Sequence, residues 1–303
     1  MPGNRLQNAL QHFLIELDGQ PAGRLFAMSG GGVQADVITM AAGPISVHKH
    51  IGALKYEDMT LTFGTSMAQA FYNWISDSIG GGSKRKSGAI VLLSSSGKPD
   101  WRLEFNNALI HSLEMPACDA GSKDPAHITI MISPESTRSI STDLKHNTGV
   151  YASGLAKGWY IHDFKLSIDG LDCTHVRSIE ALRVGKKITF DAVANIRDEV
   201  LDEGPEEYSD LVVTLNSNHA SGFLKWFEEF VEKGRNSPTD EKNGVLHFFA
   251  PNASKAYFKM ELLGLGLYKM EGAKSVNPNI AMPLTFRLYC NEMKFSAGPA
   301  AMT

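Results

Sequence analysis

The pentapeptide FYNWI at residues 71–75 decides the fold, because a related pentapeptide, FLKWF, returns at residues 223–227. A tyrosine-led run precedes each one, YEDMTLT from residue 56 and YSDLVVT from residue 208. A constant offset of about half a chain is the mark of an internal repeat. The following residues mark the repeat, and each pair is separated by 152 positions in the 303-residue chain: Tyr56 and Tyr208, Phe71 and Phe223, Trp74 and Trp226.

Each pentapeptide lies in an amphipathic stretch with helical spacing. From Phe223 the large apolar residues fall at i, i+3, i+4, i+7 and i+8, and the first half carries the same stripe around Trp74. This pattern predicts one helix per half with a buried face. Ser66 with Gln69 fits a capping box for the first helix, and residues 216–218 can cap the second. Burial of a tryptophan and its large neighbours would let each helix seal one end of a small barrel.

The remainder of each half reads as strands. Alternating runs end in Asp-Gly at residues 18–19 and again at 169–170, which predicts a strand, a tight turn and a second strand at the start of each half. Further alternating runs fill both halves, and a polar, glycine-bearing segment at 139–157 reads as a linker. We therefore expect a mainly β fold with one helix per domain: two tandem β-barrel domains, residues 1–150 and residues 151–303.

Composition places limits on the function. The formal charge of −4 and the pI near 6.2 argue against the basic surface typical of nucleic-acid-binding proteins. Three widely spaced cysteines, Cys118, Cys173 and Cys290, indicate reduced thiols. The first residues lack a signal-peptide core, and no run approaches the ~18 apolar residues of a membrane span. We expect a protein made soluble, with no membrane insertion.

Two long connections differ between the halves. The first, residues 41–54, carries His48 and His50, which share a face on an extended chain and could bind one metal, but no third ligand is near in sequence. The alternative is a solvated or subunit-contacting loop. The second is acidic, and is either a solvated loop or a contact for a basic partner. A calcium site is less favoured, since the EF-hand spacing is absent. Its carboxylates are Asp198, Glu199, Asp202, Glu203, Glu206, Glu207 and Asp210.

No catalytic pattern emerges from the sequence. The run SGGG at residues 29–32 leads into an alternating, strand-like stretch, whereas a phosphate-binding loop opens into a helix. A nucleophile elbow, HExxH and a dinucleotide fingerprint are absent. We expect no catalytic, metal-binding or cofactor-binding residues, and two copies of one strand-rich fold indicate a structural role.

The motifs of the first half resemble the tail tube protein family of contractile-tailed phages and phage-tail-like injection systems. The resemblance covers about residues 10–136 and rests on KYEDMTL from residue 55, FYNWI, RKSGAIVLL from residue 85, GKP from residue 97 and WRLEFNNA from residue 101. It implies the fold shared with the hemolysin-coregulated protein of type VI secretion, a small β-barrel flanked by one helix and assembled in hexameric rings. The second half fits more loosely, with Tyr257 where the first has Trp101.

The resemblance implies a non-enzymatic ring protein of a virion tail or injection particle, assembled in the bacterial cytoplasm, whose lumen passes DNA or effectors without binding them. Three duplicated subunits would form a pseudo-hexamer, or six would form two layers. Neighbouring barrels would pair edge strands, and residues 38–54 and 189–208 would contact adjoining rings. Other partners would be tail tube, sheath, and baseplate or spike proteins. One alternative is a hub or adaptor ring joining the tube to the baseplate or spike, and another is an enzyme or ligand-binding barrel.

Overall fold

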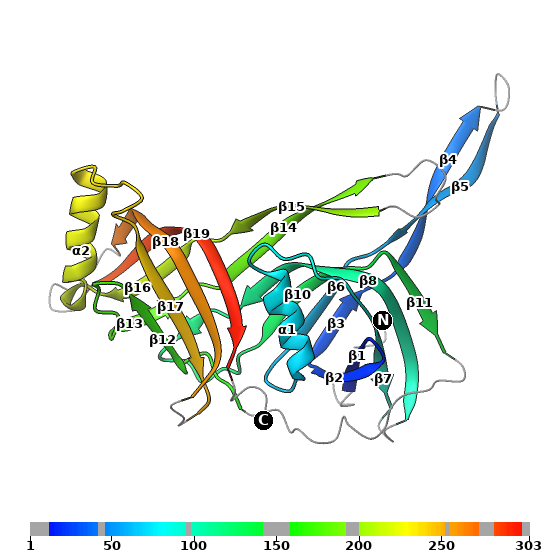
Figure 1. Ribbon diagram of the computed structural model, residues 1–303, viewed down its shortest axis with the longest axis horizontal. Coiled ribbons are helices and arrows are strands. Elements are labelled where there is room, and N and C mark those ends of the chain that lie inside the picture. Colours follow the sequence, from blue (N-terminus) through cyan, green and yellow to red (C-terminus); the bar gives the residue numbers. More distant parts are fainter. Residues whose placement is uncertain are drawn as a thin grey trace, which may run out of the picture.

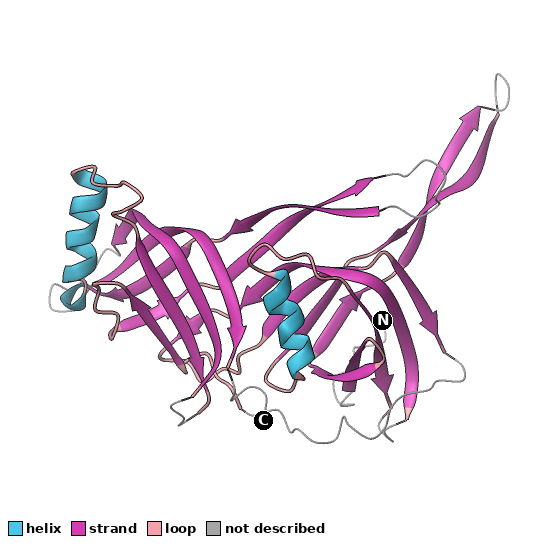
Figure 2. Ribbon diagram, in the orientation of Figure 1, coloured by secondary structure: helices cyan, strands magenta, loops and turns pink. Residues whose placement is uncertain are grey.

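The computed structural model describes residues 12–41, 46–94, 98–141, 158–191, 200–251, 255–272 and 282–298. Strands predominate, and the two helices lie against the sheets (Figure 2), so the predicted mainly β class is confirmed. The elements of the first half are β1 His12–Leu17, β2 Gln20–Leu25, β3 Ala27–Gly30, β4 Val33–Ala41, β5 Val47–Tyr56, β6 Met59–Phe63, α1 Gln69–Ser78, β7 Lys86–Leu93, β8 Pro99–Met115, β9 Cys118–Asp119, β10 Ile128–Ser133 and β11 Ser136–Ile140. Those of the second half are β12 Phe164–Ile168, β13 Val176–Ile179, β14 Leu182–Asp191, β15 Val200–Tyr208, β16 Leu211–Asn216, α2 Ser221–Phe227, β17 Lys242–Phe249, β18 Ala256–Gly272 and β19 Pro283–Ala297.

Two curled sheets hold the core. The first has the strand order β2-β1-β7-β8-β10-β6-β3, with β11 also pairing with β8, and the second has the order β12-β17-β18-β19-β16-β13-β9. The β4–β5 hairpin forms a separate two-stranded ladder that projects from one end of the molecule (Figure 1). All neighbours in these ladders are antiparallel, as expected for sheets built from hairpins.

The two sheets correspond strand by strand. The path β1-β7-β8-β10-β6-β3 has its counterpart in β12-β17-β18-β19-β16-β13. Ladder irregularities recur as well: β8 has a left-handed residue at Asn107 (φ 49°), and β18 has one at Gly264 (φ 63°). Four residues further on, each strand has a bulge facing its partner, at His111 and at Tyr268. Bulges are specific local features of a ladder, so their recurrence identifies equivalent positions.

The aromatic helices form as the sequence predicts, but their caps differ. Phe71 and Phe223 are fully buried, and Trp74 and Trp226 are 1% and 7% exposed. Both helices begin after alanines that make no side-chain cap hydrogen bond, so the predicted capping box is wrong. The Ser66 hydroxyl instead donates to the Arg24 carbonyl, which joins the helix entry to β2. After Phe227, the second helix widens into a π-helical turn at Glu228–Glu232.

The core is continuous across the two halves, rather than one core per half. Helix α1 packs on β8 and β2 of its own sheet and also on β19 of the second sheet. Tyr72 of α1 and Phe258 of β18 lie with ring centroids 5.4 Å apart, and Trp159 contacts Phe258 at 5.0 Å. One cluster of buried apolar residues therefore includes side chains from both sheets.

Several predicted loops are strands. Most of the connection at 41–54 belongs to β5, which pairs with β4, and the acidic stretch from residue 200 is β15, which pairs with β14. Glycine, proline and carboxylates made both segments resemble loops, yet cross-strand pairing overrides such weak preferences. The second half also lacks the predicted strand after its Asp-Gly turn, where Leu171 makes only a single bridge to Ile168. The linker begins later than predicted, because Ser136–Ile140 form β11, and the boundary near residue 150 lies outside the described residues.

We predict that Trp74→Ala lowers the free energy of unfolding by about 3–5 kcal/mol, the usual range for truncation of a buried tryptophan. The indole is 1% exposed, and its Nε1 donates to the Lys84 carbonyl at 2.7 Å, so the variant loses packing and a hydrogen bond. Urea unfolding followed by fluorescence measures the change. The exposed Lys225→Ala serves as a control and should stay within about 0.5 kcal/mol of wild type. An unchanged midpoint for Trp74→Ala would contradict the core assignment.

Candidate functional site: the junction between the two halves

A strand ladder joins the two halves. The outer edge of β8 pairs with β14 in the register Met115↔Leu182, Glu114↔Arg183, Leu113↔Val184 and Ser112↔Gly185. A shorter ladder joins β9 to β13. The sheet of the first half thus continues through β14 into β15, and the β14–β15 hairpin runs beside the first half toward the end that carries β4–β5 (Figure 1). An edge strand carries unpaired backbone groups, and here the second half of the same chain pairs with them.

A buried group of charges fixes the hairpin on the first half. The ammonium of Lys186 lies 2.9 Å from a Glu203 oxygen and 3.4 Å from a Glu206 oxygen. These three side chains are only 4%, 12% and 8% exposed. The same ammonium donates to the Gly82 carbonyl, and the Ser83 hydroxyl donates to Glu203. Buried ions need such complete pairing, because a buried charge without partners is costly.

The loop after α1 is shaped to receive Glu206. The backbone N–H groups of Gly80 and Gly81 both donate to this carboxylate at 3.0 Å. Their φ angles are 100° and 89°, in the region that favours glycine. A side chain on Gly82 would collide with the backbone of Asp77, since its Cβ would lie 1.6 Å from that carbonyl oxygen. Gly80 and Gly81 therefore form a backbone site for a carboxylate from the second half, and the Gly82 carbonyl accepts from Lys186 beside it.

The pKa values of the junction reflect this pairing. Burial alone would raise the pKa of Glu206, but hydrogen bonds from Tyr208, Gly81 and Gly80 and the charge of Lys186 outweigh it and lower that pKa. Burial and the bond to Glu206 raise the pKa of the Tyr208 phenol. In the first sheet, burial opposes but does not overcome the hydrogen bonds from His111 and Ser133, which lower the pKa of Asp58. Glu206 is thus held as a carboxylate at neutral pH.

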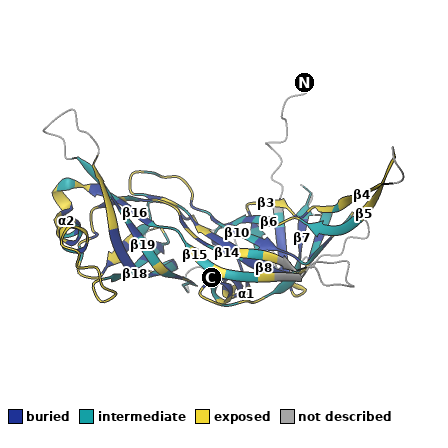
Figure 3. Cartoon of the chain, turned by 90° about the horizontal axis from the view of Figure 1, so that it is seen from above, coloured by how far each residue is buried: buried dark blue, intermediate teal, exposed yellow. Residues whose placement is uncertain are grey.

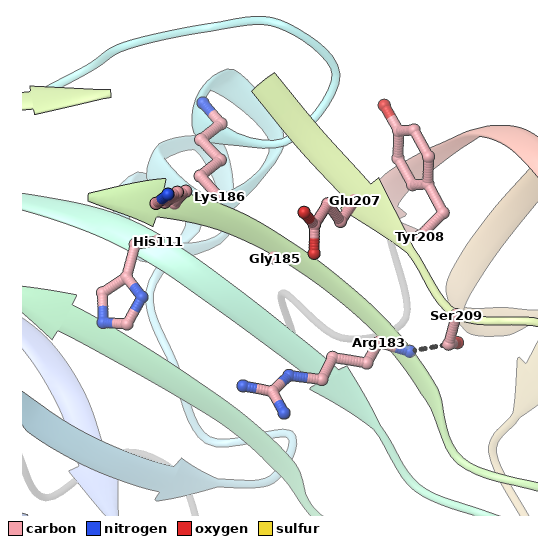
Figure 4. Close-up of a pocket in the computed structure, with 8 residues that line it drawn as sticks. His111, Arg183, Gly185, Lys186, Glu207, Tyr208 and Ser209 are labelled. Carbon is pink, nitrogen blue, oxygen red and sulfur yellow. Dashed lines mark hydrogen bonds between the residues drawn. The ribbon is translucent and has the colours of Figure 1, made fainter. Parts of the chain in front are cut away.

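An open cavity of about 510 Å³ lies on the junction, between β8 and the β14–β15 hairpin. Figure 4 shows side chains from both halves around it, and the backbone N–H of Arg183 donates to the Ser209 hydroxyl at 2.8 Å. The Arg183 Nε also approaches the Ser112 hydroxyl at 3.2 Å, which ties the wall to β8. Across the described part of the chain, no three histidine, cysteine or carboxylate side chains gather as metal ligands. The cavity is lined by His111, Arg183, Gly185, Lys186, Lys187, Glu207, Tyr208 and Ser209.

Some of the residues predicted to contact other subunits are exposed, some lie outside the described residues, and some bind within the chain. His48 and His50 are exposed on β5, and Asp202 and Glu207 are exposed on β15. Asp198 and Glu199 lie outside the described residues. Glu203 and Glu206 contact the glycine loop of the same chain, and the use of these residues between subunits stays a prediction.

Sequence reasoning missed both the lysine and the glycines that receive the acidic hairpin. Lys186 stands next to Lys187 and is separated from its carboxylate partners along the chain, so nothing local marks it as buried. In the sequence, the run of Gly80 to Gly82 after the predicted helix indicates only the end of that helix. Its second use could have been suspected, since consecutive N–H groups in left-handed turns form anion-binding concavities.

Residues 10–138 match the family described as T4-like virus tail tube protein gp19. No curated protein matches the chain. The resemblance of the first half to the tail tube family is therefore confirmed.

Solved structures that resemble the chain cover about half of it. The anti-feeding prophage tube terminating cap has 22% identity and a TM-score of 0.39, and covers 47% of this chain and 93% of its own. A chain of the PVC sheath-tube complex, from an extracellular contractile injection system, has 22% identity and a TM-score of 0.38, covering 43% and 88%. Hcp1 from Flavobacterium johnsoniae has 12% identity and a TM-score of 0.26, covering 45% and 95%.

Within the described residues, neither helix is long and apolar enough to cross a membrane.

We predict that Lys186→Met destabilises the junction by about 3–5 kcal/mol, because Glu203 and Glu206 would remain buried without their cation. The neighbouring exposed Lys187→Met is the matched control, with an expected change within about 0.5 kcal/mol. Urea midpoints of the two variants measure the difference. Equal midpoints would mean that the charge group contributes nothing to the docking of the hairpin.

The lowered pKa of Glu206 predicts a pH dependence. A depressed folded-state pKa contributes stability above the ordinary carboxyl value of 4.5, and that stability is lost as the pH falls through the folded-state pKa. The difference in unfolding free energy between wild type and Glu206→Gln should therefore be largest near neutral pH and shrink in acid. Paired urea titrations from about pH 7 to about pH 3 test this. A difference that stays constant would argue against a special role for this carboxylate.

Proposed function

We propose that the chain consists of two tandem tail-tube-like domains, residues 1–150 and 151–303, and that three copies close into a pseudo-hexameric ring of a phage tail or phage-tail-like contractile injection particle. The ring serves as a conduit, and DNA or effectors pass through its lumen without specific binding. Its partners are further copies of itself together with tube, sheath, and baseplate or spike proteins, in a particle assembled in the bacterial cytoplasm. The proposed role is structural and not enzymatic.

The ladder between β8 and β14 carries the proposal. It places the two sheets side by side with their backbones hydrogen-bonded, in the way that two separate subunits of a strand-paired ring would be. The match of residues 10–138 to the tail tube family supports the role of the first half. The corresponding strand orders and the bulges at His111 and Tyr268 support a second domain of the same kind.

A hub or adaptor ring is the second candidate, and the difference between the two hairpins favours it. The β4–β5 hairpin exposes apolar side chains such as Val37 and Ile51, whereas β15 carries carboxylates. Alternating unlike surfaces around a ring suit contacts with a partner of lower symmetry. Copy number separates the candidates: a tube subunit recurs along the particle, and an adaptor is present as one ring.

Particle mass tests the proposal directly. Three copies of the 33.0 kDa chain give 99 kDa, and six give 198 kDa. We expect mass photometry of the purified protein to give a 99 kDa species, and negative-stain images to show rings with a central hole. A 33.0 kDa species alone, at every concentration, would refute ring assembly.

A further inference from the structure

The β4–β5 hairpin and the outer edge of β18 correspond to the β14–β15 hairpin and the outer edge of β8, but in the described part of the chain they are not paired with each other. We propose that the β4–β5 hairpin of one copy pairs with the outer edge of β18, residues 269–272, in a second copy, as β14–β15 pairs with β8 inside each chain. The inference rests on the proposed ring and specifies the surface that closes it. Five observations carry it: matching hairpins, matching edges, an unpaired strand, exposed apolar side chains and their placement.

The two hairpins are equivalent residue by residue at their bases. Val33 pairs with Tyr56 in the first, and Val184 pairs with Tyr208 in the second. Both ladders then shift register after two more pairs, so that Asp36 and Lys187 occupy corresponding bulges. The free hairpin therefore has the backbone that already docks once within the chain.

The acceptor edges are equivalent as well. The left-handed residues Asn107 and Gly264 and the bulges at His111 and Tyr268 align β8 with β18, which places Leu113 opposite Met270 in the correspondence. In the described part of the second sheet, β17 pairs with β18 only as far as Leu265. The outer edge of β18 beyond that point has no strand on it there, although β14 covers the same edge of β8.

These equivalent positions are buried in the internal ladder and exposed on the free hairpin and the free edge. Val184 and Leu113 face each other in the internal ladder and are fully buried, but their counterparts Val33 and Met270 are 52% and 36% exposed. Scattered exposed apolar side chains are ordinary, whereas matched sets on two complementary edges mark a contact surface.

The helices repeat this contrast. On α1, Tyr72 and Ile79 are 0% and 4% exposed, and Tyr72 packs on a phenylalanine of the second sheet. The corresponding residues beside Phe223 and Phe230 are Leu224 and Val231, which are 37% and 38% exposed. The face that α1 uses against the second half is thus left uncovered on α2.

A second copy is the occupant that fits. The β4–β5 hairpin and the α2–β18 surface lie at opposite ends of the molecule, so one chain cannot bring them together (Figures 1 and 3). A hairpin that docks head to tail on a second copy repeats the internal contact, and a head-to-tail contact gives a ring where its rotation closes. Transfer of the internal register pairs Val33 with Met270 and Gln34 with Lys269.

Disulfide trapping tests this register. We would mix Val33→Cys protein with Met270→Cys protein, both in a Cys290→Ser background because Cys290 is a partly exposed native thiol. Directly opposed cross-strand residues have Cβ atoms about 4.5–5.5 Å apart, close to disulfide geometry. Under mild oxidation the mixture should give a 66 kDa covalent dimer of two 33.0 kDa chains, and neither variant alone should do so.

Met40→Cys with Met270→Cys is the register control. Met40 lies on the same strand, seven residues from Val33 or about 23 Å at strand spacing, and is 54% exposed, so it should give no dimer. Rings seen by mass photometry without the Val33–Met270 dimer would overturn this interface and leave the proposed function standing. A dimer from Val33→Cys alone would overturn the head-to-tail arrangement, and monomers without any cross-link would overturn both.

Discussion

The structure depends on the pairing of one sheet edge, the outer side of β8, with a strand from the other half of the chain. Without β14 this edge would present unpaired backbone groups and the apolar side chain of Leu113 to solvent. With it, the two sheets are held so that α1 packs on both and one apolar core forms. The glycine loop and its carboxylate lie at the same junction, so backbone pairing, apolar burial and charge pairing act together.

The charges make that docking specific. Lys186 and Glu206 are paired across β14 and β15, and the same ladder position in the free hairpin holds Ala35 and Leu54. Buried ions are tolerated only where the receiving surface supplies partners, and the N–H groups of Gly80 and Gly81 do so. The acidic hairpin therefore fits the first half of its own chain, while the apolar hairpin makes no such demand. The two hairpins thus share a backbone geometry but differ in the kind of surface that each can bind.

The sequence predicts what depends on local periodicity. The stripe around Trp74 predicted α1, and the alternating runs predicted the sheets and the repeat. It predicted neither the β5 nor the β15 strand, because His48 to Gly52 and Glu203 to Glu207 have no clean alternation and contain residues typical of loops. These strands form because a partner strand is present, which is a tertiary effect. The capture of Glu206 by Gly80 likewise joins positions 126 residues apart, and no local pattern encodes such a contact.

The offset between the halves shows which features of the fold are constrained. It is 152 between Tyr56 and Tyr208 but 157 between Asn107 and Gly264, so the connections after the helices have changed length. The bulges, the left-handed residues and the threonine contacts, Thr62 with Thr129 and Thr214 with Thr285, keep their ladder positions. Residues whose geometry is set by a ladder tolerate no shift, since a one-residue slip would turn each side chain to the opposite face. The exposed apolar residues Val33 and Met270 lie at such ladder positions, so their exposure belongs to the geometry of the repeat and not to a variable loop.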